Sequence, residues 1–211
     1  ASQRGGSRRW AAAGLLGGGP WGLRGESRVA AAAVGSEWQN SETFTVDGET
    51  FTATRVGDRE QRPGFRILKP RDTLEHLAEL IEREKPRRIV ELGIFLGGSV
   101  ALTALLARPD KMIAVEINPN RVAPLDRLIT ERGLNVEAPY GIDQAGPDLP
   151  AIVDAAFDGP LDLVLDDASH RPDLTRASFE VLFPRLRPGG LFVIEDWGWP
   201  ALSPLIAEQV L

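Results

Sequence analysis

Four carboxylates and a histidine occur in two short stretches near the C-terminal end of the sequence. Asp166, Asp167 and His170 follow one apolar run, and Glu195 and Asp196 follow another. If both runs are parallel strands, their carboxyl ends lie at one edge of a sheet and bring the acids together. Two unit charges about 4 Å apart interact by about 4 kcal/mol at an effective dielectric of 20, so such a cluster needs compensation.

Three kinds of compensation are open for these acids: protonation of some of them, neutralisation by Lys or Arg, or binding of a cation. All-oxygen ligands favour Mg²⁺, Ca²⁺ or Mn²⁺ over zinc. An imidazole has an ordinary pKa of about 6.5 and can take a proton from a metal-bound hydroxyl group, which makes His170 a candidate general base. Alternatively, the acids cap the helices that follow, and His170 is structural.

A glycine-rich turn precedes these acids in the chain. Residues 91–99 read Glu-Leu-Gly-Ile-Phe-Leu-Gly-Gly-Ser and join an apolar run to a helical one. Glycines let the backbone approach a ligand closely, and the helix that follows offers free N–H groups. The spacing matches neither the G-x-G-x-x-G fingerprint nor a Walker P-loop, which needs a Lys after its glycines. Taken alone, the turn is also compatible with a structural role.

Two further acids follow other expected strands. Glu116 comes 23 residues after Gly93, where a carboxylate accepts hydrogen bonds from both hydroxyl groups of a ribose. Alternatively, Glu116 starts the helix expected at Asn118 and Pro119. Asp143 either lies near an adenine amino group or is a turn residue.

Helices and strands that would position these residues alternate from residue 73 onward. We expect helices at 73–84, 100–107 and 174–186, and one from Asn118 whose start is disturbed by Pro124. We expect strands at 88–92, 112–115, 136–140, 161–165 and 191–194. The last of these should begin after a break at residues 188–190. This alternation predicts a Rossmann-like, doubly wound α/β fold with a mainly parallel sheet.

The first 72 residues follow another pattern. Residues 1–40 are rich in Gly, Ala and Arg without periodicity, so we expect a disordered or variable segment, with a transit peptide as an alternative. Residues 41–72 should hold a β-hairpin and a linker, because two alternating runs flank an Asp-Gly turn and place Phe44 opposite Phe51. One hairpin is not stable alone, so its Phe face should pack on the main domain or on a partner.

Composition argues against several classes of function. A net charge of −6 disfavours a general nucleic-acid surface, and no apolar run is long enough to span a membrane. The absence of Cys excludes disulfides, zinc ribbons and thiol nucleophiles, and two histidines, His76 and His170, are too few for a multi-histidine metal site. We expect a cytoplasmic protein that binds neither nucleic acid nor membrane.

Together, residues 73–200 resemble the class I S-adenosylmethionine-dependent methyltransferases. The resemblance rests on the glycine-rich turn, the acid after the second strand, and Leu-Arg-Pro-Gly-Gly at 186–190. It implies an S-adenosylmethionine site formed by Glu91, Gly93, Gly97, Gly98, Ser99, Glu116, Asp143 and Asp166. In that site Glu91 and Gly93 would border the methionine part, Glu116 the ribose and Asp143 the adenine.

The run Asp-Asp-Ala-Ser-His followed by Ile-Glu-Asp is similar to the metal-dependent macrolide sugar O-methyltransferases and to cephalosporin hydroxylase-like proteins. This similarity implies Mg²⁺ bound by Asp167, Glu195 and Asp196, with His170 and Asp167 as catalytic residues. The implied acceptor is a hydroxyl group of a small molecule, such as a sugar of a natural product. A hydroxylase is disfavoured because a non-haem iron site needs a pair of His ligands.

The C-terminal end departs from that family, whose sheet has seven strands. After Pro200 only residues 201–211 remain, enough for one helix, so we expect residues 73–211 to lack the last two strands. Either the chain is a fragment, or the hairpin or another subunit supplies the missing edge, and an open edge favours a homo-oligomer. Trp197 and Trp199 either line an acceptor pocket or pack under that helix. The rival hypothesis is a truncated, non-catalytic module that binds or oligomerises.

Overall fold

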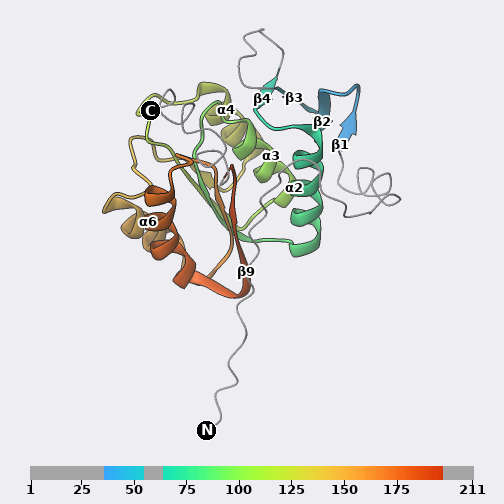
Figure 1. The fold of residues 1–211 in the computed structure, drawn as a ribbon. Helices are drawn as coiled ribbons and strands as arrows, with labels where there is room; N and C mark the ends of the chain where they lie inside the picture. The colour runs from blue at the N-terminus through green and yellow to red at the C-terminus, as the bar shows by residue number, and fades with distance from the viewer. Residues whose placement is uncertain (1–35, 55–63, 197–211) are drawn as a thin grey trace.

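The computed structural model describes residues 36–54 and 64–196, which form two sheets (Figure 1). The larger sheet has the order β7-β6-β5-β8-β9, and all its neighbouring strands are parallel. Its strands are β5 (Arg88–Leu92), β6 (Lys111–Val115), β7 (Val136–Glu137), β8 (Leu161–Asp166) and β9 (Leu186–Ile194). The chain enters at the middle strand and winds outward to each side in turn, which confirms the doubly wound α/β fold.

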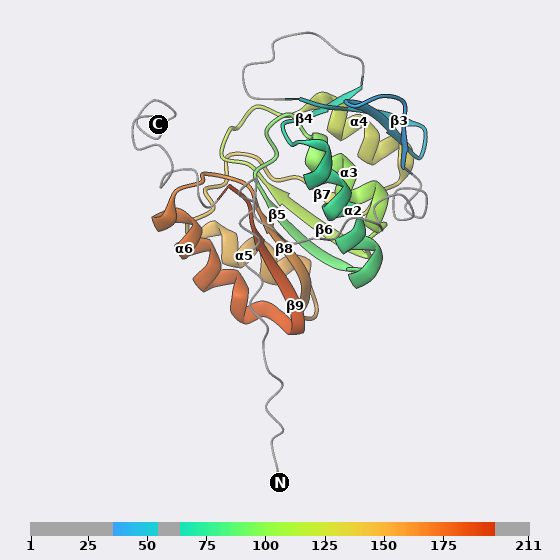
Figure 2. The same cartoon turned by 45° about the vertical axis from the view of Figure 1, so that its right-hand side comes forward.

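Helices cover both faces of this sheet (Figure 2). One face packs against α2 (Arg71–Glu84), α3 (Gly98–Ala107) and α4 (Ala123–Arg132). The other packs against α5 (Asp148–Ala156) and α6 (Pro172–Leu182). Successive side chains of a strand point to opposite faces, so Ile89 of β5 joins the first core and Val90 the second. No helix among the described residues is long and apolar enough to cross a bilayer.

The smaller sheet contains the expected hairpin. Its strands are β1 (Ser36–Trp38), β2 (Thr43–Val46), β3 (Glu49–Ala53) and β4 (Phe65–Ile67), in that order. Phe44 pairs with Phe51 as predicted, and Asp47 and Gly48 both have the positive φ that a type I′ turn needs. Strand β1 lies within the range 1–40 that we expected to be variable, while residues 1–35 lie outside the described part.

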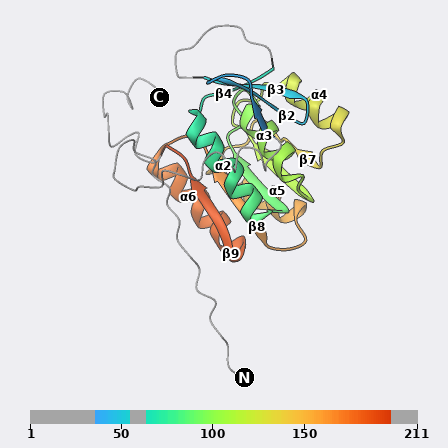
Figure 3. The same ribbon diagram turned by 90° about the vertical axis from the view of Figure 1, so that its right-hand side faces the viewer.

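The small sheet packs against α3 in the helix layer that covers the first face of the large sheet (Figure 3). Phe44 and Phe51 are almost fully buried and share one hydrophobic core with Leu74 of α2 and Val100 of α3. The backbone of β4 passes directly over the first residue of α3. A Cβ atom at Gly98 would lie 2.1 Å from the carbonyl oxygen of Arg66, so only glycine permits this approach.

The start of α4 and the end of α6 differ from the expected boundaries, and a proline explains each difference. The helix expected from Asn118 starts instead at Ala123, with Pro124 in its first turn. Proline is favoured there because its fixed φ suits the helix and its missing N–H has no intrahelical partner. Likewise α6 ends at Leu182, and the 3₁₀ turn η1 (Phe183–Arg185) follows it because proline at 184 cannot continue the helix.

The last strand and one helix also differ from expectation. Strand β9 begins at Leu186, so residues 188–190 are an irregularity inside it: Leu161 pairs with Leu186, but Leu163 pairs with Leu191. Helix α5 has no counterpart among the expected ranges, because few of its side chains are deeply buried. The helix expected at 201–211 lies outside the described residues, as do Trp197 and Trp199, for which either a pocket or a packing role was expected.

We predict that Gly98→Ala lowers the free energy of unfolding by about 3 kcal/mol, because the added methyl group meets the backbone of β4. Gly159→Ala is the control, since the atoms nearest to its methyl group all belong to the guanidinium at the end of the Arg88 side chain, the closest at 3.2 Å. Urea unfolding of both variants measures the difference. Equal stability of the two would contradict the tight approach of β4 to α3.

Candidate active site

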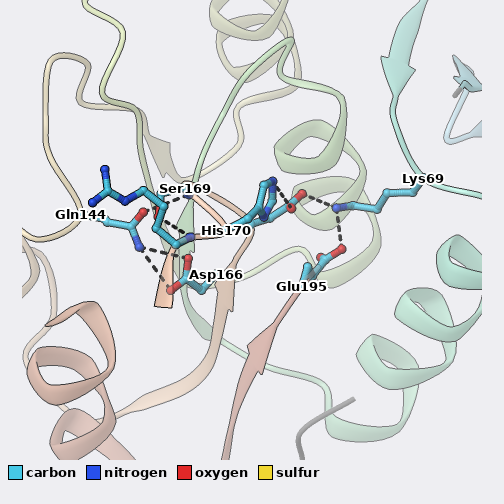
Figure 4. Close-up of polar contacts among 8 residues, drawn as sticks. Lys69, Gln144, Asp166, Ser169, His170 and Glu195 are labelled. Carbon is cyan, nitrogen blue, oxygen red and sulfur yellow. Dashed lines mark hydrogen bonds and ion pairs between the residues drawn. The ribbon is translucent and has the colours of Figure 1, made fainter. Parts of the chain in front are cut away.

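The acids identified in the sequence meet at the carboxyl edge of the large sheet (Figure 4). The backbone N–H of Asp167 donates to Leu92 O at 3.0 Å, and that of Glu195 donates to Asp166 O at 2.9 Å. The strand pairing therefore continues through the first residues after β8 and β9. Because side chains alternate along extended chain, Asp166 and Asp167 point to opposite faces of the sheet and have different surroundings.

Lys69 binds two of these acids (Figure 4). It lies between β4 and α2, and its ammonium group forms ion pairs with Asp167 and with Glu195, the latter at 2.6 Å. Burial alone would lower the pKa of Lys69, but both carboxylates outweigh burial and hold this pKa above its ordinary value. Burial raises the pKa of Glu195, and the Lys69 charge opposes that rise. Of the three compensations, neutralisation by a lysine is therefore present.

Glu91 lies fully buried on the same side of the sheet. Neither of its oxygens has a hydrogen bond of normal geometry among the described residues. Burial raises the pKa of Glu91 to about 8, while the nearby Ser99 hydroxyl and the Lys69 charge limit the rise. At neutral pH Glu91 is therefore mainly protonated and adds little negative charge to the cluster.

Asp167, His170 and Asp196 form a second group. Each places one potential ligand atom within 4.8 Å of the others, and His170 Nε2 lies 4.0 Å from Asp167 Oδ1. Both His170 and Asp196 have positive φ, which turns the chain sharply at these positions. Of the predicted magnesium ligands, Asp167 and Asp196 belong to this group, and Glu195 is linked to Asp167 through Lys69, which pairs with both.

The chemistry of this group fits a hard divalent cation. Carboxylate oxygens are the ligands that Mg²⁺ and Mn²⁺ prefer. Counted as ionised, the carboxylates of Asp167, Glu195 and Asp196 carry three negative charges, and Lys69 neutralises one. A divalent cation would balance the remaining charge of −2.

Asp166 belongs to a separate network on the other face. It is buried and accepts hydrogen bonds from Ser178 Oγ at 2.8 Å and from Gln144 Nε2 at 3.3 Å. Burial raises the pKa of Asp166, and these hydrogen bonds oppose the rise. The other end of the Gln144 amide accepts the backbone N–H of Ser169 at 3.1 Å (Figure 4). Asp166 thus helps to fix the loop that carries His170.

Glu116 holds the glycine-rich turn in place. Its Oε2 accepts the backbone N–H groups of Ile94 at 2.9 Å and Phe95 at 2.8 Å, and its Oε1 accepts that of Asn118. Glu116 does not start the next helix, which was its alternative role, because α4 begins only at Ala123.

The glycines of that turn are needed for its shape. A Cβ atom on Gly93, whose φ is +94°, would lie 2.4 Å from Asp167 O. Gly97, also at positive φ, is the N-cap of α3, with Gly98 and Ser99 in the first turn of that helix. The turn therefore lies directly against the loop that carries the acids. Asp143, in contrast, is exposed and accepts the N–H of Ala145, the turn role that the sequence allowed.

Two polar residues of this site were not predicted. Lys69 falls in the segment 41–72 that was expected to hold a linker. Gln144 directly follows Asp143, which was itself a candidate site residue. A single lysine before a proline, or a single glutamine in a loop, carries no spacing signal. Their partners lie 98 and 22 residues away in the chain, so only the fold reveals them.

Comparison with known proteins agrees with this geometry. Residues 90–197 match the family model described as a methyltransferase domain. The chain belongs to this methyltransferase domain family. The resemblance seen in the sequence is thereby confirmed.

Curated relatives and a solved structure refine this placement. The chain is 33% identical over 129 residues to demethylmacrocin O-methyltransferase of Streptomyces fradiae, covering 58% of this chain and 30% of that protein. It is 32% identical over 136 residues to 8-demethyl-8-(2-methoxy-alpha-L-rhamnosyl)-tetracenomycin-C 3'-O-methyltransferase of Streptomyces olivaceus, covering 61% and 32%. The chain thus spans about a third of the length of these relatives. The O-methyltransferase TomG of Streptomyces achromogenes has a TM-score of 0.50 at 23% identity, covering 66% of this chain and 64% of that one, and shares the fold.

The raised pKa of Glu91 predicts a pH dependence of stability. A group whose pKa rises on folding stabilises the folded state below its ordinary pKa of about 4.5, and this contribution is lost as pH rises towards 8. Between pH 5 and pH 8 the wild type should therefore lose about 3 kcal/mol more stability than Glu91→Gln.

Urea unfolding of the ligand-free protein at several pH values measures this difference. Glu131→Gln is the control, because Glu131 is exposed on α4. Parallel pH profiles of the wild type and Glu91→Gln would show that Glu91 ionises normally in the folded state.

Proposed function

We propose that this chain carries the catalytic domain of an S-adenosylmethionine-dependent O-methyltransferase acting on a hydroxyl group of a small molecule. The observation that carries the proposal is the contact between the glycine-rich turn and the loop with Asp167 and His170. A cofactor bound at this turn would lie beside His170, the candidate base. Family membership and relatives named as O-methyltransferases support it. One relative's name includes a rhamnosyl group, so we take a sugar hydroxyl as the acceptor class.

The groups that would bind the cofactor lie at the carboxyl edge of the large sheet. S-adenosylmethionine supplies a methyl group on a positively charged sulfur, which an oxygen nucleophile attacks. The Glu116 carboxylate would keep the glycine-rich turn in place and would accept further hydrogen bonds from the ribose hydroxyl groups, beside the exposed side chains of Phe95 and Ile117. Glu91 and Gly93 would border the methionine part, with Gly97, Gly98 and Ser99 at the start of α3.

His170 is the proposed general base. Its imidazole would take the proton of the acceptor hydroxyl group as the new oxygen–carbon bond forms and the sulfur–carbon bond breaks. Asp167, at 4.0 Å from Nε2, would orient the ring and stabilise the imidazolium. Asp167, Asp196 and Glu195 are the residues that would hold Mg²⁺, which lowers the pKa of a bound hydroxyl group.

Self-association is a further part of the proposal. Strand β9 is an edge of the described sheet, and within residues 36–54 and 64–196 no strand pairs with its outer side. Open edges favour pairing with another chain. A monomer with measurable turnover would exclude the rival role as a non-catalytic oligomerisation module.

Calorimetric titration with S-adenosylmethionine, with and without Mg²⁺, tests the cofactor. We expect binding by the wild type and at least about tenfold weaker binding by Glu116→Ala, because hydrogen bonds to a carboxylate contribute about 1.5–3 kcal/mol. Glu131→Ala on the exposed side of α4 is the matched control. Absence of binding by a folded sample under both conditions would refute the proposed function.

Transfer of a labelled methyl group to a panel of rhamnosides tests the base. His170→Ala should retain cofactor affinity while transfer falls at least about 100-fold, as expected for loss of general base catalysis. His76→Ala, exposed on α2, should keep wild-type activity. Parallel loss of cofactor binding and transfer in His170→Ala would instead assign a structural role to His170.

A further inference from the structure

We infer that Lys69 is a built-in cation of the acidic edge: it keeps Asp167 and Glu195 assembled without a metal ion and lowers the affinity of the edge for divalent cations. The inference deepens the proposed function by adding a positioning residue. Its test measures metal affinity and stability and needs no methyl transfer.

The first support is the geometry of the ammonium group. Lys69 is only 6% exposed, and it contacts Asp167 Oδ2 and Glu195 Oε2 at once. Asp167 Oδ1 faces His170 instead. A metal ion at Asp167 would therefore find one carboxylate oxygen already bound to a cation, and Glu195 bound to the same cation.

The second support is the charge of the surroundings. With Lys69 present the three carboxylates of Asp167, Glu195 and Asp196 leave a charge of −2, and without it they leave −3. Removing Lys69 would thus increase both the mutual repulsion of the acids and their attraction for a metal ion.

The third support is the fixed position of the Lys69 backbone. On one side Ile67 pairs with Ala53 in the small sheet, and its carbonyl accepts the N–H of Thr54 at 2.8 Å. On the other side Pro70 is the N-cap of α2, and its carbonyl accepts the N–H of Leu74 at 3.2 Å. The chain is therefore anchored two residues before Lys69 and at the residue after it, and the side chain reaches the acids from this fixed segment.

Lys69→Met tests the inference, because it keeps the length of the side chain and removes its charge. Titration calorimetry with Mg²⁺ and Mn²⁺ should give at least about tenfold tighter binding than in the wild type. The melting temperature should fall without metal and recover in millimolar Mg²⁺, whereas that of the wild type should change little. Lys69→Arg, which keeps the charge, should bind metal like the wild type.

Lys111→Met is the matched control, because Lys111 pairs with Glu137 at the opposite end of the strands and should leave metal affinity unchanged. If Lys69→Met does not fold in either condition, the comparison moves to Glu195→Gln with and without Lys69→Met, which relieves the repulsion. Unchanged or weaker metal binding on loss of Lys69, in either background, overturns the inference. A failure to bind S-adenosylmethionine would refute the proposed function and leave this result unaffected.

Discussion

Crowding of like charges at the carboxyl edge of the parallel sheet is the constraint on which the rest of the structure depends. Parallel strands bring Asp167 and Glu195 to the same edge, with Glu91 buried below them. Buried charges are stable only when they are paired or neutralised. Lys69 supplies the pairing, and protonation of Glu91 removes a further negative charge at neutral pH. The small sheet that positions Lys69 is thus a requirement of the site.

Side chains alternate between the two faces of an extended strand, so the adjacent Asp166 and Asp167 have different partners and different roles. Asp166 points towards α6, where Ser178 and Gln144 satisfy it, and it supports the loop that follows. Asp167 points towards α2 and α3, where it meets Lys69 and His170. A shift of one residue in the pairing of β8 would exchange the two, so the register of the strand determines which aspartate faces Lys69 and His170.

Local signals in the sequence predicted the parts of the fold that local physics determines. The Asp-Gly turn specified the hairpin and its Phe44–Phe51 pair, and the apolar run at Arg88–Leu92 specified β5 to the residue. The acids at the strand ends were predicted to meet because the carboxyl ends of parallel strands lie at the same edge of the sheet. The role of Lys69 depends on a contact across 98 residues, and no local pattern encodes it.

The approach of β4 to α3 at Gly98 has a consequence for where this domain can be divided or recombined. The family model matches this chain from residue 90 onward, yet the cation for the acidic edge comes from residue 69, and the strand before it packs tightly against the first turn of α3. The domain boundary given by sequence similarity therefore excludes Lys69, whereas a boundary that keeps the acids neutralised must include it. A transfer of residues 90–197 of this chain alone would carry the acids without their counter-charge.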